Sequence, residues 1–251
     1  HKLTYSLVGD QNVFTCVGNG CASCAENYTE SYAYESYGEN KAYFKFGTIN
    51  ACNFTNNAPF YLRTEGGRVV SSNVDEYNYN VKAVYNSDEN KLYVYLRGAV
   101  TTNSNSGRMI IGSNEVNNFA CEIVIEEESS ITADYSDASL AVIDTMNIGG
   151  LRFTSVDNAM LTVNPNNYGI CVAAVSDTIF ENANVTLKNG GYGACAGLYV
   201  KGNLVVNNSN LQLTTGRYGG HTRGVFLSDS KTALSGTYNI TISNSTLYAK
   251  V

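Results

Sequence analysis

The stretch Val206-Asn-Asn-Ser-Asn-Leu-Gln-Leu213 decides the fold, because its pattern occurs in three more places without gaps. Each copy reads apolar, polar, Asn, small, variable, apolar, polar, apolar. The other copies are Val156–Val163, Phe180–Leu187 and Ile242–Ala249, and the shared asparagines are Asn158, Asn182, Asn208 and Asn244. Successive asparagines are 24, 26 and 36 residues apart. A repeat of this length is typical of a solenoid whose coils stack on one another.

A second set of short apolar segments runs in phase with the first. These segments begin at a glycine and are Gly169–Val172, Gly197–Val200 and Gly224–Leu227. Alternation at period two sends one residue from each segment to a common face. The sequence predicts one such column of Ile170, Leu198 and Val225, with Val172, Val200 and Leu227 beside it.

The two sets indicate two or three short strands per coil, with inward columns of aliphatic residues. An asparagine at a tight bend tolerates a left-handed backbone, and stacked amides can form hydrogen bonds along their column. The step of 36 residues predicts an insertion near Leu227–Tyr238. An antiparallel sandwich also has short strands at regular spacing, but two in-phase ladders favour the solenoid.

This asparagine-bearing repeat resembles the right-handed parallel β-helix superfamily, the pectate-lyase-like solenoids, over about residues 120–251. The resemblance implies an all-β chain with a right-handed parallel β-helix. We expect this β-solenoid over residues 56–251, with regular coils from about residue 120. A small Cys- and Tyr-rich N-terminal β cap or subdomain is expected over residues 1–55.

The N-terminal cysteines fit two kinds of cross-link. His1, Cys16, Cys21 and Cys24 would supply nitrogen and sulfur ligands for a structural zinc, since Cys21 and Cys24 have the C-x-x-C spacing. The same cysteines, together with Cys52, fit one or two disulfides of an exported protein. The segment also resembles the small His- and Cys-bearing repeats of surface proteins in gut Firmicutes, in which an initial His precedes a Thr-Cys pair and a second Cys.

Tyrosines gather in residues 27–46, and two roles fit them. Tyrosine stacks on sugar rings while its hydroxyl forms hydrogen bonds, so the cluster would suit a glycan surface. The same residues would suit strands that pack over the first coil of the solenoid. The members of the cluster are Tyr28, Tyr32, Tyr34, Tyr37 and Tyr43.

Overall composition excludes two classes of partner. The formal net charge of −6 argues against nucleic-acid binding, which needs a basic surface. The chain has no apolar run of about 18 residues or more, so we expect no membrane span in it. Only 15% of the residues are charged, while Gly and Tyr are frequent, as is typical of strands and turns.

The sequence offers few groups for catalysis, because it contains only two histidines. The residues weighed for a hydrolase or lyase site are Asp144, Asp157, Asp177, Glu181, His221 and Arg223. No tight pair of acids of the kind used by β-helix hydrolases stands out. We therefore assign no catalytic residue and no cofactor beyond the zinc alternative.

The expected function is that of a non-catalytic β-solenoid module, structural or adhesive, in a secreted or cell-surface bacterial protein. Its expected partner is a glycan or a host surface protein. The alternative is a polysaccharide lyase or glycoside hydrolase of the pectate-lyase-like superfamily.

Overall fold

The computed structural model describes a chain of strands and turns. The residues described are 3–8, 11–16, 28–29, 42–52, 58–102, 107–113, 119–135, 140–166, 168–189, 196–215, 223–231 and 235–250, with side chains in 44–49 and from 58 onward. These ranges contain three large sheets, which we name sheets I, II and III, and a separate small sheet.

Sheet I has nine strands and includes the first strand of every coil. In spatial order they are β24 (Ile240–Ser243), β21 (Leu204–Asn207), β18 (Thr178–Glu181), β15 (Gly150–Ser155), β12 (Ala120–Ile125), β9 (Lys91–Leu96), β8 (Val81–Asn86), β6 (Phe60–Glu65) and β7 (Arg68–Val70).

Sheets II and III receive the second and third strands of each coil. Sheet II consists of β10 (Val100–Thr101), β13 (Ser129–Ala133), β16 (Met160–Pro165), β19 (Asn184–Asn189), β22 (Asn210–Thr215) and β25 (Thr246–Lys250). Sheet III consists of β23 (Arg223–Leu227), β20 (Ala196–Val200), β17 (Ile170–Ala174), β14 (Ala141–Met146), β11 (Met109–Ser113), β4 (Ala42–Phe46) and β5 (Ile49–Cys52).

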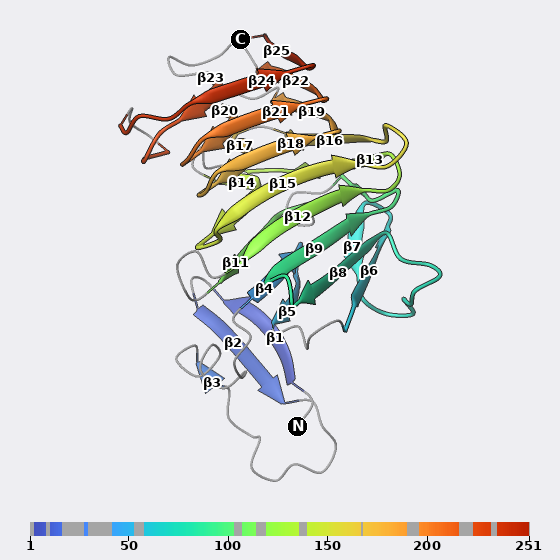
Figure 1. The fold of residues 1–251 in the computed structure, drawn as a ribbon. Helices are drawn as coiled ribbons and strands as arrows, with labels where there is room; N and C mark the ends of the chain where they lie inside the picture. Colours follow the sequence, from blue (N-terminus) through green and yellow to red (C-terminus); the bar gives the residue numbers. More distant parts are fainter. Residues whose placement is uncertain are drawn as a thin grey trace.

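The chain passes through sheets I, II and III in turn, so that each third strand pairs in parallel with its predecessor. Four regular coils run from β12 to β23, as the stacked green to red strands in Figure 1 show. An earlier coil, β9–β11, has a sheet II strand of only two residues, and β24 and β25 follow the last regular coil. The predicted all-β solenoid is confirmed.

The interior is filled by residues that alternate along each strand. In β9 the side chains of Leu92, Val94 and Leu96 are fully buried, while their neighbours are partly exposed. The rings of Phe153 and Phe180 lie one coil apart and stack with centroids 4.7 Å apart. Stacking of equivalent residues therefore forms the core, as expected for a chain in which each coil contacts only its neighbours.

The bend between sheets I and II is the most regular corner of the solenoid. Only Asn182 and Ala183 separate β18 from β19, and Asn208 and Ser209 separate β21 from β22. The asparagines of the repeat all have positive φ, with values of 61° for Asn158, 49° for Asn182, 46° for Asn208 and 48° for Asn244. Asparagine visits this left-handed region more readily than most residues, which explains its place at the bend.

The small residue after the asparagine has a polar role when it is serine. The Ser209 hydroxyl donates to the Asn207 carbonyl at 2.7 Å and accepts from the Ala183 N–H of the preceding coil at 2.9 Å. The N–H of Ser209 in turn donates to the Ser245 hydroxyl of the following coil at 3.0 Å. These serines therefore supply hydrogen bonds between coils as well as a small side chain.

Amide side chains also connect coils, at positions beside the predicted asparagine column. The Nδ2 of Asn207 donates to Oε1 of Glu181 at 2.8 Å, and the Nδ2 of Asn210 donates to Oδ1 of Asn184 at 3.1 Å. A third set joins Asn203 to Asp177, through its backbone N at 2.7 Å and its Nδ2 at 3.2 Å. The side-chain ladders are thus spread over three columns.

Two details of the predicted registers are wrong. Phe153, and not Val156, aligns with Phe180, because the bend after β15 spans residues 156–159 and leaves Val156 exposed. Val172, and not Ile170, aligns with Leu198 and Val225. This second error is a shift of two residues, which keeps a side chain on the same face, so period-two alternation does not detect it.

Close packing between coils explains two glycines of sheet III. Gly197 and Gly224 are the second residues of β20 and β23, and the register keeps the same offset on both sides of them. A Cβ on Gly197 would lie 2.8 Å from the carbonyl oxygen of Gly224, too close for any other residue without movement. Glycine is favoured in a strand where another backbone approaches this closely.

Antiparallel strands extend two sheets before the first coil. In sheet I, β8 pairs with β9 and β6 pairs with β8, while in sheet III β4 pairs with β11. The β6–β7 turn lies beside the free edge of β10, and the N–H of Thr102 donates to the Gly67 carbonyl there at 3.1 Å. The small sheet β1 (Leu3–Val8), β2 (Gln11–Cys16) and β3 (Tyr28–Thr29) is antiparallel.

Residues 228–239 connect β23 to β24, whereas the corresponding connection after β20 spans only residues 201–203. The insertion expected from the repeat spacing is therefore present at this corner. We refer to residues 228–239 as the insertion.

Candidate functional site

The predicted zinc ligands lie largely outside the described residues. His1, Cys21 and Cys24 are not described, and Cys16 is described only as the backbone at the end of β2. Among the residues that are described, no group of three or more His, Cys, Asp or Glu side chains gathers around a common point. Zinc and disulfides both stay predictions for the N-terminal cysteines.

The residues weighed for catalysis that the structure describes have separate structural roles. His221 lies outside the described residues, and the Arg223 guanidinium lies 3.9 Å from the centroid of the Phe226 ring. Asp177 and Glu181 are occupied in the ladders between coils, and Asp157 is a bend residue with φ of 47°. These three acids serve the corners of successive coils.

Tyrosines instead gather on the outer face of sheet I, next to the first coil. Tyr61, Lys82 and Tyr95 occupy directly paired positions on β6, β8 and β9. Tyr93 lies on the same side of β9, because the residues between the tyrosines point inward. We define the tyrosine face as Tyr61, Tyr79, Lys82, Tyr93 and Tyr95.

The rings of this face form two pairs. Tyr61 and Tyr79 have centroids 5.5 Å apart at 41°, and Tyr93 and Tyr95 have centroids 6.1 Å apart with planes tilted by only 22°. The Lys82 ammonium joins the pairs, since its Nζ lies 3.8 Å from the Tyr95 centroid and 5.4 Å from the Tyr79 centroid. In the described part of the chain Lys82 has no carboxylate partner, so its charge is held by the two rings.

Charged residues border the tyrosine face on β9 and β12. The Lys91 ammonium pairs with Glu122 and lies 4.7 Å from the Tyr93 ring centroid. Glu122 also accepts a hydrogen bond from the Thr154 hydroxyl at 3.0 Å. Burial lowers the pKa of Lys91, but the contacts with Glu122 and Tyr93 together outweigh burial, and the pKa is raised overall.

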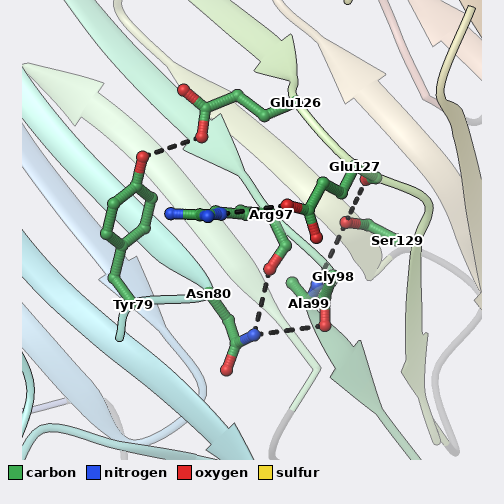
Figure 2. A network of polar contacts seen from close by, with 8 residues as sticks. All are labelled: Tyr79, Asn80, Arg97, Gly98, Ala99, Glu126, Glu127 and Ser129. Carbon is green, nitrogen blue, oxygen red and sulfur yellow. Dashed lines mark hydrogen bonds and ion pairs between the residues drawn. The ribbon is translucent and has the colours of Figure 1, made fainter. Parts of the chain in front are cut away.

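A polar network lies at the end of the face where β9 turns toward sheet II (Figure 2). The Tyr79 hydroxyl donates to Glu126 at 2.8 Å, and the Arg97 Nε donates to Glu127 at 3.0 Å. The Asn80 amide donates to the carbonyls of Arg97 at 3.0 Å and of Gly98 at 3.3 Å, which fixes the start of the bend.

This network holds the Tyr79 phenol in its neutral form. Burial and the hydrogen bond to Glu126 raise the pKa of Tyr79 to about 12. Burial likewise raises the pKa of Tyr61, Tyr93 and Tyr95 above their ordinary value. The four hydroxyls are therefore protonated near neutral pH.

The sequence alone identifies only some of the residues of the tyrosine face. Alternation in Leu92-Tyr-Val-Tyr-Leu96 shows that Tyr93 and Tyr95 share an outer face. The pairing of β9 with β8 and β6, which adds Tyr61 and Lys82, depends on antiparallel registers that alternation does not specify. Of the predicted cluster in residues 27–46, the side chains of Tyr28, Tyr32, Tyr34, Tyr37 and Tyr43 lie outside the described residues.

No helix among the described residues is long and apolar enough to reach across a bilayer. Comparison with models of protein families, with curated proteins and with solved structures finds no match for this chain.

Proposed function

We propose that this protein is a non-catalytic β-solenoid module of a secreted or cell-surface protein, and that its tyrosine face binds glycans. The observation that carries the proposal is the gathering of Tyr61, Tyr93 and Tyr95 on the outer side of sheet I. Tyr79 and Lys82 lie against these rings.

The chemistry of the face suits sugars. A tyrosine ring offers an apolar surface to the C–H groups of a pyranose, and its hydroxyl serves as donor and acceptor. The nearly parallel rings of Tyr93 and Tyr95 provide the flattest such surface. The nearby Lys91 and Glu122 side chains add a donor and an acceptor for sugar hydroxyls.

The scaffold keeps these groups in place. Tyr95 lies on β9, which is paired on one side with β8 and on the other with β12. Strand positions fixed by packing lose little conformational freedom on binding, which favours affinity. A rigid lateral face also suits adhesion. Many copies of the protein on one surface would present the same binding site, and several sites that bind together give a stronger attachment than one.

A glycan array followed by calorimetry on the best ligand tests the proposal. Truncation of a stacking ring, in Tyr93→Ala or Tyr95→Ala, is expected to weaken binding about tenfold, corresponding to about 1.4 kcal/mol. The matched control is Tyr248→Ala, because Tyr248 is exposed on β25 in sheet II. Binding that survives both sheet I changes, or that is equally weakened in the control, would exclude this face as the site.

The enzymatic alternative is tested on the same preparations with an assay for new reducing ends or unsaturated products on uronate and neutral polysaccharides. Turnover that disappears in Arg223→Ala or His221→Ala would replace the binding proposal by a lyase or hydrolase.

We further propose that the solenoid winds in the right-handed sense, as nearly all parallel crossover connections do. The relationship to pectate-lyase-like solenoids of gut bacterial surface proteins and the Cys- and Tyr-rich cap belong to the same proposal.

A further inference from the structure

A row of charged side chains crosses the outer face of sheet III, away from the tyrosine face. Lys45 on β4 pairs with Ile110 on β11, and Ile110 pairs with Asp144 on β14. Arg108 lies just before β11, and its guanidinium reaches Asp144. Lys231, from the insertion, reaches the same carboxylate.

Each oxygen of the Asp144 carboxylate contacts one cation. Its Oδ2 is 3.0 Å from an Arg108 guanidinium nitrogen, and its Oδ1 is 3.1 Å from the Lys231 ammonium. The Asp144 side chain is only 8% exposed, whereas those of Arg108 and Lys231 are 30% and 28% exposed. The carboxylate is thus covered, while both cations keep a surface that solvent can reach.

The cations outnumber the acid. Lys45 has no acidic partner among the described residues, and burial together with the positive charge of Arg108 lowers its pKa. The Nε of Arg108 is buried without a hydrogen-bond partner in the described part of the chain. Arg108 and Lys231 bind this one carboxylate, and Lys45 lies two strands away from it across β11. Positive charge is therefore in excess, which a further anion would offset.

The insertion places Lys231 at this point. Two hydrogen bonds close the base of the insertion. The Ser228 hydroxyl accepts from the Ser235 N–H at 2.9 Å, and the Asp229 N–H donates to the Ser235 carbonyl at 3.1 Å. From β23 the insertion passes β20 and β17 to reach Asp144 on β14. A segment that interrupts the repeat therefore completes the cluster.

We propose that an oxyanion binds between Lys45, Arg108 and Lys231. Arginine and lysine suit the oxygens of a sulfate, a phosphate or a sugar carboxylate, the first through its planar fork and the second as a point charge. The site is independent of the tyrosine face, because it belongs to a different sheet. A ligand with acidic groups would use it, and so would a free inorganic anion.

Isothermal calorimetry with sodium sulfate, sodium phosphate and sodium glucuronate, each at ionic strength held constant with chloride, tests the proposal. Saturable binding of one equivalent of at least one of these anions is expected. Lys45→Met and Lys231→Met, which keep the apolar stem, are each expected to weaken it about tenfold. The preferred anion then distinguishes a sugar carboxylate from the two inorganic sources.

Two further variants make the test specific. Lys201→Met removes an exposed lysine from the turn before β21 and is expected to leave the affinity unchanged. Asp144→Asn removes the competing negative charge and is expected to strengthen anion binding severalfold, an effect that a purely structural ion pair would not produce. Absence of saturable binding for all three anions, or equal weakening in Lys201→Met, overturns the proposal. Circular dichroism establishes that each variant is folded, and Lys231→Met in the insertion tests the site if Lys45→Met does not fold.

Discussion

At the scale of single residues, the bend between sheets I and II combines a backbone requirement with a polar one. Asn208 supplies the positive φ that turns the chain, and Ser209 supplies hydrogen bonds both within its coil and to the preceding coil. Ser209 is nearly buried, so water cannot replace these bonds.

Replacing this serine tests the polar contribution. Ser209→Ala keeps the volume small but leaves the N–H of Ala183 without its acceptor at 2.9 Å. We expect a loss of about 1–3 kcal/mol in the free energy of unfolding, the cost of an unsatisfied buried donor. Urea denaturation measures it, with Thr214→Ala on the exposed side of β22 as a control expected to change stability little. Equal stability of the two variants would mean that crowding alone selects the small residue.

At the scale of strands, stability depends on whether another coil covers the element. Phe180 on β18 is fully buried and stacks on Phe153 at 4.7 Å, whereas Ile242 occupies the same column on β24 and is 48% exposed. The same position in the repeat is therefore core in one strand and surface in another.

A pair of truncations measures this difference. Phe180→Ala is expected to cost about 3–5 kcal/mol, because it removes a large buried ring and leaves a cavity. Ile242→Ala is expected to cost less than about 1.5 kcal/mol, since about half of that side chain already contacts solvent. Denaturant unfolding monitored by tyrosine fluorescence gives both values. A comparable loss in the two variants would contradict the exposed position of β24.

The strands also show what the sequence can predict. The bends at Asn182, Asn208 and Asn244 and the parallel stacking behind them follow from a repeat with constant internal spacing. The column of Ile170 is wrong by two residues, because alternation fixes the face and not the partner. The tyrosine face and the Lys45–Asp144 row each join antiparallel extension strands to the coils, and no repeat marks that pairing.

At the scale of the molecule, tyrosines that keep their protons in the fold are spread along the whole solenoid. Burial and the Glu126 contact raise the pKa of Tyr79 near the first coil to about 12, and burial raises the pKa of Tyr199 on β20 to about 12. Tyr135, whose hydroxyl donates to the Ala141 carbonyl at 3.0 Å, also has its pKa raised by burial. Each of these groups binds its proton more tightly folded than unfolded.

Alkaline pH should therefore destabilise the protein. These tyrosines contribute fully below the unfolded pKa of about 10, and the contribution is lost as pH rises through the folded values toward about 12. We expect the free energy of unfolding to fall from about pH 10 upward, with a smaller fall in Tyr79→Phe, which has no proton to lose at that position. Urea titrations at a series of alkaline pH values measure the slope. Stability that stays constant across that range would contradict the protonated state of the buried phenols.

The unequal corners of the coil bear on how such a protein can be rebuilt. The sheet I–II corner keeps two residues after β18, β21 and β24, while the connection from sheet III to sheet I changes from residues 201–203 to residues 228–239. The short corner fixes how the strands of successive coils align. Lengthening a surface loop elsewhere costs little free energy. The long corner is thus a natural graft point: foreign peptides can replace the insertion and be displayed at a fixed height along the rod without changing the alignment of the coils beneath.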